Sequence, residues 1–250
     1  MRRMGKCWSV VVLGFLLSVS GCGVRGPIKP PLRQLPASAS HVSARQIGAT
    51  VLVSWNVPKT REDGEPLTDL QGFDLYRDSF EPASGCVECA ASELPLRDVD
   101  LEYLEGVTRE EDRLTFRDMP PVADTGYRYR IVSVAASGRS DAASVDLVFA
   151  AAPPVPGKPT VERRTEGLWL RWTPLAEQQR TADFVGYNIY RRKAGEAVPS
   201  APINDEICLD SAFMDRTVTT GAYEYTVRSV WRVNNRRVES ADSPGVASSF

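Results

Sequence analysis

Hydrophobic and polar residues alternate along much of the chain after about residue 39. Val51, Val53 and Trp55 alternate with Ser54 and Asn56, which is the period-two pattern of a half-buried β-strand. Further alternating segments occur at 73–76, 114–118 and 127–133, and a last strand of this half is expected at 143–150. No stretch here shows a helical period with caps, so the pattern predicts an all-β fold.

The same order of signals occurs a second time. Gly72 to Arg77 and Gly186 to Arg191 share the order Gly, aromatic, polar, aliphatic, Tyr, Arg. In each copy a strand ending in Trp, at Trp55 or Trp172, comes before this segment, and a Tyr-x-Tyr strand follows it. A repeat of this kind in a chain of 250 residues predicts two domains.

The spacing between the two copies changes along the chain. It is 114 residues between Tyr76 and Tyr190 (190 − 76), but 97 residues between Asp118 and Asp215 (215 − 118). The first copy therefore carries an insertion of 17 residues between 77 and 118 (114 − 97).

Proline-rich segments divide the chain. Residues 151–159 contain four prolines and a glycine, a composition that does not fit a central strand. Residues 23–36 are also rich in proline and are typical of an extended spacer. The expected organisation is a signal at 1–21, a spacer at 22–38, a first domain with its insertion at 39–152, a linker at 153–159 and a second domain at 160–250.

The N-terminal residues form a targeting signal. Three basic residues within 1–6 precede an apolar stretch at 8–19 that is too short for a comfortable membrane span. Val19-Ser20-Gly21-Cys22 follows and resembles the bacterial lipobox, in which the cysteine thiol receives a diacylglycerol and the chain is cleaved before it. The resemblance implies that Cys22 is the lipidated first residue of the mature chain. The alternative is an ordinary signal peptide cut near Gly21.

The lipobox resemblance also implies a location. Lipoproteins with Asp after the lipidated Cys tend to stay at the inner membrane, so Gly23 at this position implies the outer membrane, facing the periplasm or the cell surface. The lipid on Cys22 would hold the chain at the membrane without a spanning helix. Residues 22–27, Cys-Gly-Val-Arg-Gly-Pro, also resemble the start of the small lipoproteins that assist lipopolysaccharide-translocon assembly; a Gly- and Pro-rich linker is the alternative.

The repeated residues resemble a second family. The order of these motifs is similar to that in bacterial fibronectin type III domains. It runs from Trp on the second strand through Gly-aromatic-x-aliphatic-Tyr-Arg on the third and Phe-x-Asp to Gly-x-Tyr-x-Tyr-x-Val on the sixth. The first copy departs slightly, with Gly126 directly before Tyr127 and Ile131 in the Val position. The resemblance implies two tandem seven-stranded, immunoglobulin-like β-sandwiches. Trp55 and Trp172 would anchor their cores, and Tyr127 and Tyr223 are candidates for the tyrosine corner.

Charge and composition exclude some functions. A formal net charge of −2 argues against a nucleic-acid partner. The single histidine, His41, stands before the first strand, and no Ser-His-Asp or Cys-His set can be assembled around it. Acidic residues between 98 and 112 lack the register of a calcium loop and are interpreted as solvated faces. No catalytic residue, metal site or further cofactor is therefore expected.

Three cysteines remain after the signal and the lipidation site. Cys86 and Cys89 lie within the insertion, and a local disulfide is the first interpretation, with metal or redox work as the alternatives. Zinc would need further ligands that the sequence does not supply. Cys208 is expected to be a half-buried free thiol, with intermolecular pairing as the alternative.

Basic residues gather in the second domain. If Tyr223, Tyr225 and Val227 face inward, neighbouring basic side chains face outward on the same sheet. They form a candidate cationic strip for the phosphates of lipopolysaccharide or an acidic partner, although Arg commonly decorates exposed sheets. Its members are Arg191, Arg192, Lys193, Arg228, Arg232, Arg236 and Arg237.

These features predict a non-enzymatic lipoprotein whose domains bind an envelope protein or polymer. Two other classes stay open. One is an accessory glycan-acting or thiol-redox enzyme that uses Cys86 and Cys89 or the acidic segment. The other is a lipopolysaccharide-assembly factor that acts through residues 22–27.

Overall fold

The computed structural model describes residues 34–83, 91–196, 199 and 201–249. The signal, the spacer up to residue 33, Cys22, Cys86 and Cys89 lie outside these ranges. Within them the chain is built of β-strands with a single 3-10 turn, Glu177–Gln179, so the predicted all-β class is confirmed. The strands of the first half are β1 (Ser40–Ile47), β2 (Thr50–Asn56), β3 (Leu70–Phe80), β4 (Arg97–Asp100), β5 (Val107–Glu110), β6 (Arg113–Asp118), β7 (Thr125–Ala135), β8 (Gly138–Arg139) and β9 (Ala143–Phe149).

These nine described strands form a β-sandwich, which we call the first sandwich. One sheet has the order β1-β2-β6-β5, and the other has the order β4-β3-β7, with β8 and β9 also paired to β7. The two sheets enclose one hydrophobic core. Trp55 is fully buried in it and packs edge-on against Phe73, with ring centroids 5.6 Å apart. The residue expected to anchor this core therefore does so.

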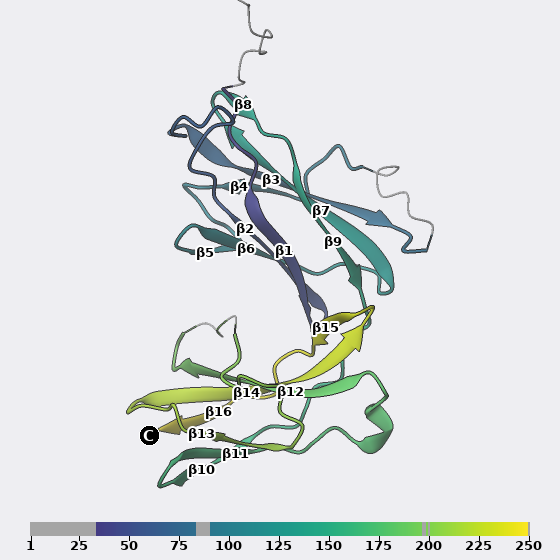
Figure 1. Cartoon of the computed structure of the whole chain (residues 1–250), viewed down its shortest axis with the longest axis vertical. Helices are drawn as coiled ribbons and strands as arrows, with labels where there is room; N and C mark the ends of the chain where they lie inside the picture. The colour runs from purple at the N-terminus through teal and green to yellow at the C-terminus, as the bar shows by residue number, and fades with distance from the viewer. Residues whose placement is uncertain (1–33, 84–90, 197–198, 200, 250) are drawn as a thin grey trace, which may run out of the picture. The chain divides into compact units, whose positions relative to one another are not determined.

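The second half repeats this arrangement with its own core, and we call it the second sandwich. Its strands are β10 (Thr160–Arg164), β11 (Gly167–Arg171), β12 (Phe184–Lys193), β13 (Ala212–Asp215), β14 (Ala222–Val233), β15 (Arg236–Glu239) and β16 (Val246–Ser249). Strands β10-β11-β13 form one sheet, and β12-β14, with β15 and β16, forms the other (Figure 1). Trp172 packs edge-on against Tyr187 at 5.4 Å, which matches the Trp55 contact.

A parallel bridge joins the two sandwiches. Ile47 of β1 pairs with Glu239 of β15, so the β1-β2-β6-β5 sheet and the sheet of β12, β14, β15 and β16 join into one eight-stranded sheet. The amide of Gly48 donates to the Glu239 carbonyl at 2.7 Å. Residues 33–250 accordingly form one compact unit, although they hold two separate cores.

The insertion explains why the first sandwich has more strands than the seven expected. Between β3 and β6 the chain forms β4, which pairs with β3, and β5, which pairs with β6. In the second sandwich, the described residues of the corresponding segment form no named strand, and an isolated bridge joins Tyr187 to Cys208. The insertion thus extends both sheets of the first sandwich.

The repeated glycine allows this neighbouring segment to approach. A Cβ on Gly72 would lie 2.0 Å from the carbonyl oxygen of Val99 in β4, and a Cβ on Gly186 would lie 2.6 Å from the carbonyl oxygen of Cys208. Both glycines also follow a register shift in their pairing with the next strand. Only glycine avoids these clashes, which is why it recurs in the motif.

Candidate functional site

The recurring Arg, Asp and Tyr of the motif meet inside each sandwich. In the first, Arg77 of β3 donates to both carboxylate oxygens of Asp118 at 2.8 Å, and the Tyr129 hydroxyl donates to the same group at 2.7 Å. Asp118 is buried at the end of β6. Three residues that are distant in sequence therefore form one ion-paired triad between the two sheets.

The second sandwich repeats this triad. Arg191 donates to Asp215 at 2.7 Å, and Tyr225 donates to the same carboxylate oxygen at 2.8 Å. Burial acts to raise the pKa of Asp215, but hydrogen bonds from Tyr225 and Thr217 and the charge of Arg191 outweigh it and hold that pKa below its usual value. Arg191 is thus engaged in an internal ion pair.

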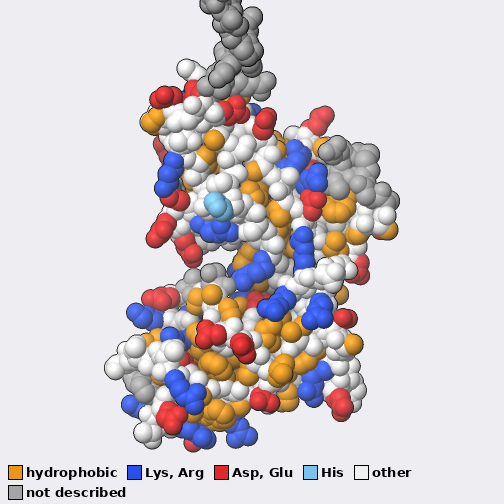
Figure 2. Space-filling model, in the orientation of Figure 1, with side chains coloured by type: hydrophobic (Ala, Val, Ile, Leu, Met, Phe, Trp, Pro, Cys, Tyr) orange, Lys and Arg blue, Asp and Glu red, His pale blue; other side chains and the backbone are white. Residues whose placement is uncertain are grey.

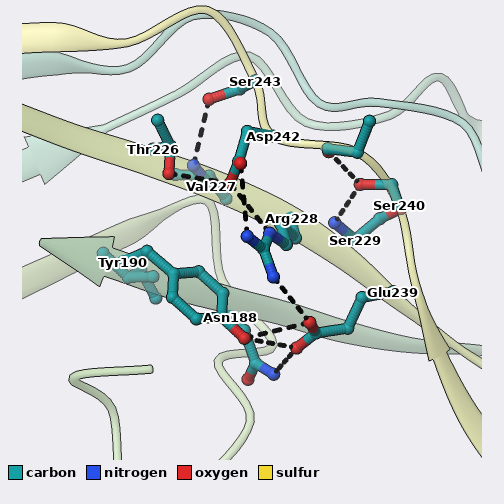
Figure 3. Close-up of polar contacts among 12 residues, drawn as sticks. Asn188, Tyr190, Thr226, Val227, Arg228, Ser229, Glu239, Ser240, Asp242 and Ser243 are labelled. Carbon is teal, nitrogen blue, oxygen red and sulfur yellow. Dashed lines mark hydrogen bonds and ion pairs between the residues drawn. The ribbon is translucent and has the colours of Figure 1, made fainter. Parts of the chain in front are cut away.

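Arg228 is buried rather than accessible. Its side chain is on the outer face of β14, as expected, but residues 239–242 cover it and leave it 4% exposed. It donates to Asp242 at 2.8 Å and to Glu239 at 3.1 Å, and it lies over the Tyr190 ring at 4.0 Å (Figure 3). The prediction that Arg228 is available to a partner is wrong, because two carboxylates and an aromatic ring enclose it.

Neighbouring side chains complete this network. The Tyr190 hydroxyl donates to Glu239 at 2.7 Å, and the Asn188 amide donates to it at 2.5 Å (Figure 3). Burial, together with the negative charge of Glu239, raises the pKa of Tyr190. Every oxygen of the Glu239 carboxylate thus accepts a hydrogen bond, as a buried charge requires.

The other members of the predicted strip separate into two groups. Arg192 pairs with Glu224 at 2.6 Å, and Arg236 donates to the Asp146 carbonyl at 2.9 Å. Lys193, Arg232 and Arg237 are exposed and form no ion pair with the described residues. The strip is therefore divided into arginines bonded to other residues of the chain and three exposed side chains, Lys193, Arg232 and Arg237.

The outer face of the first sandwich holds polar residues that were not singled out in the sequence. Ser43, Ser54, Thr115 and Thr108 are successive cross-strand partners on β1, β2, β6 and β5. We call this line the hydroxyl row. The Ser54 and Thr115 hydroxyls lie 2.9 Å apart. The alternation of Arg113, Thr115 and Arg117 with buried Leu114 and Phe116 was the signal that could have revealed this face.

Arginines flank the hydroxyl row on both sides. The next cross-strand row on one side is Arg45, Leu52 and Arg117. On the other side it contains Arg113, which donates to Ser43 at 2.8 Å and to the side-chain oxygen of Asn56 at 3.2 Å. Neutral oxygens thus orient the Arg113 guanidinium, and among the described residues neither Arg113 nor Arg117 has an ion-pair partner.

These residues line a groove of about 1180 Å³. Arg192, Arg228 and Asp242 of the second sandwich also line it. Figure 2 shows Lys and Arg side chains gathered in the middle of the face it presents. We call this feature the arginine groove; it has five arginines, Arg45, Arg113, Arg117, Arg192 and Arg228, against the carboxylates of Glu110 and Asp242.

Most of the remaining residues singled out in the sequence are held in contacts within the fold or lie on its surface. The Tyr127 hydroxyl donates to the Val122 carbonyl at 3.2 Å, a tyrosine corner, whereas the Tyr223 hydroxyl lies 2.8 Å from the Thr219 hydroxyl. Cys208 is a half-buried free thiol, and burial raises its pKa. His41 is exposed and lies within β1, not before it. The acidic residues between 98 and 112 are exposed as predicted, apart from half-buried Asp112, which pairs with Lys59.

In the part of the chain that the structure describes, no group of three or more His, Cys, Asp or Glu side chains could hold a metal ion. In the same residues no helix has the length and apolar character needed to cross a membrane.

Comparison with known proteins adds no relative. No protein-family model matches the chain, and no curated protein matches it.

Proposed function

We propose that the chain is a non-enzymatic lipoprotein of the bacterial outer membrane that binds an envelope protein or polymer through two fibronectin type III domains. The lipobox ending in Cys22 supports the anchor. The strand orders β1-β2-β6 and β4-β3-β7-β9 support the fibronectin assignment, because this fold pairs three strands against four. The proline-rich spacer suits display of the domains away from a membrane.

The observation that carries the non-enzymatic proposal is the duplicated triad. The polar residues that recur, Arg77 with Asp118 and Arg191 with Asp215, are used to join the sheets within each sandwich. A residue that recurs in both copies for packing reasons gives no evidence of catalysis. Binding is expected instead on surfaces that differ between the two copies, and the arginine groove is the main one.

Anchoring is tested by Cys22→Ala. Removing the acylated thiol should move the chain from the membrane fraction to the soluble fraction, because a covalent lipid supplies about 0.8 kcal/mol per buried methylene. Cys208→Ala is the matched control and should stay in the membrane fraction, because Cys208 is a half-buried thiol of the second sandwich. Sedimentation of the Cys22→Ala chain with membranes would contradict the anchor.

The binding role is tested by crosslinking in intact cells. A photo-crosslinking amino acid at Arg117 or Arg232, both exposed, should capture an envelope protein or polymer. Crosslinking from neither position, with the chain correctly anchored, would contradict a binding role for these surfaces.

A further inference from the structure

Arg113 and Arg117 of the arginine groove differ from the arginines of the second sandwich, because no carboxylate among the described residues forms an ion pair with them. In the second sandwich, Arg191, Arg192 and Arg228 each face a carboxylate within 2.6 to 3.1 Å. Arg113 is instead oriented by neutral oxygen acceptors, and Arg117 is exposed without an ion-pair partner among the described residues. An oriented guanidinium whose charge is not neutralised internally is prepared to pair with an external anion.

The rest of the lining is suited to hydroxyl-rich ligands. The hydroxyl row runs across four strands between the flanking arginines. Ile47, Leu52 and Val107 are the larger apolar side chains of the lining, and no aromatic residue belongs to it in the described part of the chain. Protein interfaces usually have aromatic or apolar centres, so this lining is a poor match for a protein surface.

The size of the groove indicates an extended ligand. Its volume of about 1180 Å³ exceeds the range of about 300–1,000 Å³ that is typical of small-molecule sites. It is also open along the sheet surface, across the strands β1, β2, β6 and β5. Several units of a polymer fit such a groove better than one small molecule.

We propose that the arginine groove binds an anionic polysaccharide. Arg113 and Arg117 pair with the phosphate or carboxylate groups of the polymer, and the exposed ends of the hydroxyl row, Ser43 and Thr108, exchange hydrogen bonds with its sugar hydroxyls. This rests on the proposed binding function and names its ligand class. It also places the ligand mainly on the first sandwich, not on the strip of the second.

The experiment measures binding of fluorescently labelled polymers to the full-length chain in uncharged detergent micelles, by fluorescence anisotropy. The probes are polygalacturonate, phosphorylated dextran, neutral dextran and polyglutamate. At least one charged sugar polymer should bind, and neutral dextran should not. The tighter of the two charged sugars identifies carboxylate or phosphate as the recognised group. Failure of both to bind, or equally tight binding of polyglutamate, overturns the proposal.

Single arginine variants then locate the site. Arg117→Gln should weaken binding of the charged sugar about tenfold, because a hydrogen bond to a charged group is lost. Since Arg117 is exposed and has no ion-pair partner among the described residues, the thermal unfolding midpoint of this variant should not change. Arg113→Gln should weaken binding to a similar degree. Arg171→Gln is the matched control: it removes an exposed arginine from the outer face of β11 and should leave the affinity unchanged.

The outcomes separate this inference from the proposed function. If Arg171→Gln weakens binding as much as Arg117→Gln does, the attraction is general charge and the groove is not the site. If the chain is anchored through Cys22 and crosslinks to an envelope protein but binds no charged sugar, the proposed function stands and the inference fails. If the chain is soluble in cells yet binds the sugar through Arg117, the inference stands and the anchor fails.

Discussion

At the scale of single residues, the polar groups of this protein act mostly as internal connectors. Asp118 and Asp215 each accept hydrogen bonds from an arginine and a tyrosine of the opposite sheet. The Glu239 carboxylate accepts hydrogen bonds from Arg228, Tyr190 and Asn188. Removing one member of such a set leaves the others buried without partners, which costs more than the pair contributes in net stability.

The pKa of Asp215 makes the second sandwich sensitive to acid. A carboxyl whose pKa is lower in the folded chain than in the unfolded chain adds stability above the unfolded value, about 3.9, and this stability is lost as the pH falls through the folded value. Asp215→Asn should lower the free energy of unfolding by about 2–3 kcal/mol at pH 7. The difference from the wild type should shrink as the pH falls below that unfolded value.

Urea unfolding at several pH values, followed by tryptophan fluorescence, measures this effect. Asp205→Asn is the control, because Asp205 is exposed. A difference between Asp215→Asn and the wild type that is the same at all pH values would contradict the role assigned to the charge.

Arg228 should be the costliest arginine to replace. Arg228→Ala leaves Glu239 and Asp242 without their buried partner and should lower the free energy of unfolding by about 3–5 kcal/mol. Arg232→Ala, four residues further along β14 and exposed, should change it by less than about 0.5 kcal/mol. Equal effects of the two changes in chemical denaturation would show that the network is not stabilising.

At the scale of elements, the glycine of the repeated strand controls whether a neighbouring segment can pair with it. Gly72→Ala would place a Cβ 2.0 Å from the Val99 carbonyl oxygen, so β4 has to shift. The expected loss is about 1–3 kcal/mol, together with faster amide hydrogen exchange in β4. Gly64→Ala is the control, since a Cβ there meets no atom within 4 Å and only its positive φ adds strain. Unchanged exchange in β4 of the Gly72→Ala variant would contradict this account.

The strands that contain the repeat were predictable, whereas their neighbours were not. Alternation identified β2, β3, β6 and β7, because alternate residues of each strand point into a core. β4 and β5 have four residues each, which is too short for alternation to stand out. A similar limit explains why the burial of Arg228 was not predicted. Alternation correctly predicted the face of β14 on which its side chain lies. That residues 239–242 cover this face depends on a distant segment of the chain, which leaves no local pattern in the sequence.

At the scale of the whole molecule, the junction at Gly48 links the two sandwiches. Gly48 has a φ of +57°, and a Cβ on it would lie 2.9 Å from the Ala241 amide nitrogen. Gly48→Ala should therefore disturb the hydrogen bond to Glu239. Amide exchange should accelerate in residues 44–50 and 236–242 together.

Gly195→Ala separates strain from contact at this junction. Gly195 also has a positive φ, +85°, but a Cβ there meets no atom within 4 Å, so exchange at 44–50 should stay as in the wild type. Acceleration of only one of the two junction segments in Gly48→Ala would show that they do not depend on each other.

The junction was the part of the architecture least accessible to sequence reasoning. The duplicated motif predicted two copies of a sandwich, and the described strands follow that duplication. A single bridge between Ile47 and Glu239 produces no periodic pattern in the sequence, so it could not be predicted. The arginine groove depends on residues brought together from β1, β2, β5 and β6, so the individual arginines were visible in the sequence but their common surface was not.

The bridge between β1 and β15 has a consequence for the order of folding. It connects residues 192 positions apart (239 − 47), and closing so long a loop is entropically unfavourable until other contacts exist. During synthesis the first sandwich is complete long before Glu239 leaves the ribosome. The contact that unites the two sandwiches is therefore expected to be the last to form, and the first sandwich must keep β1 in place by its pairing with β2 until then.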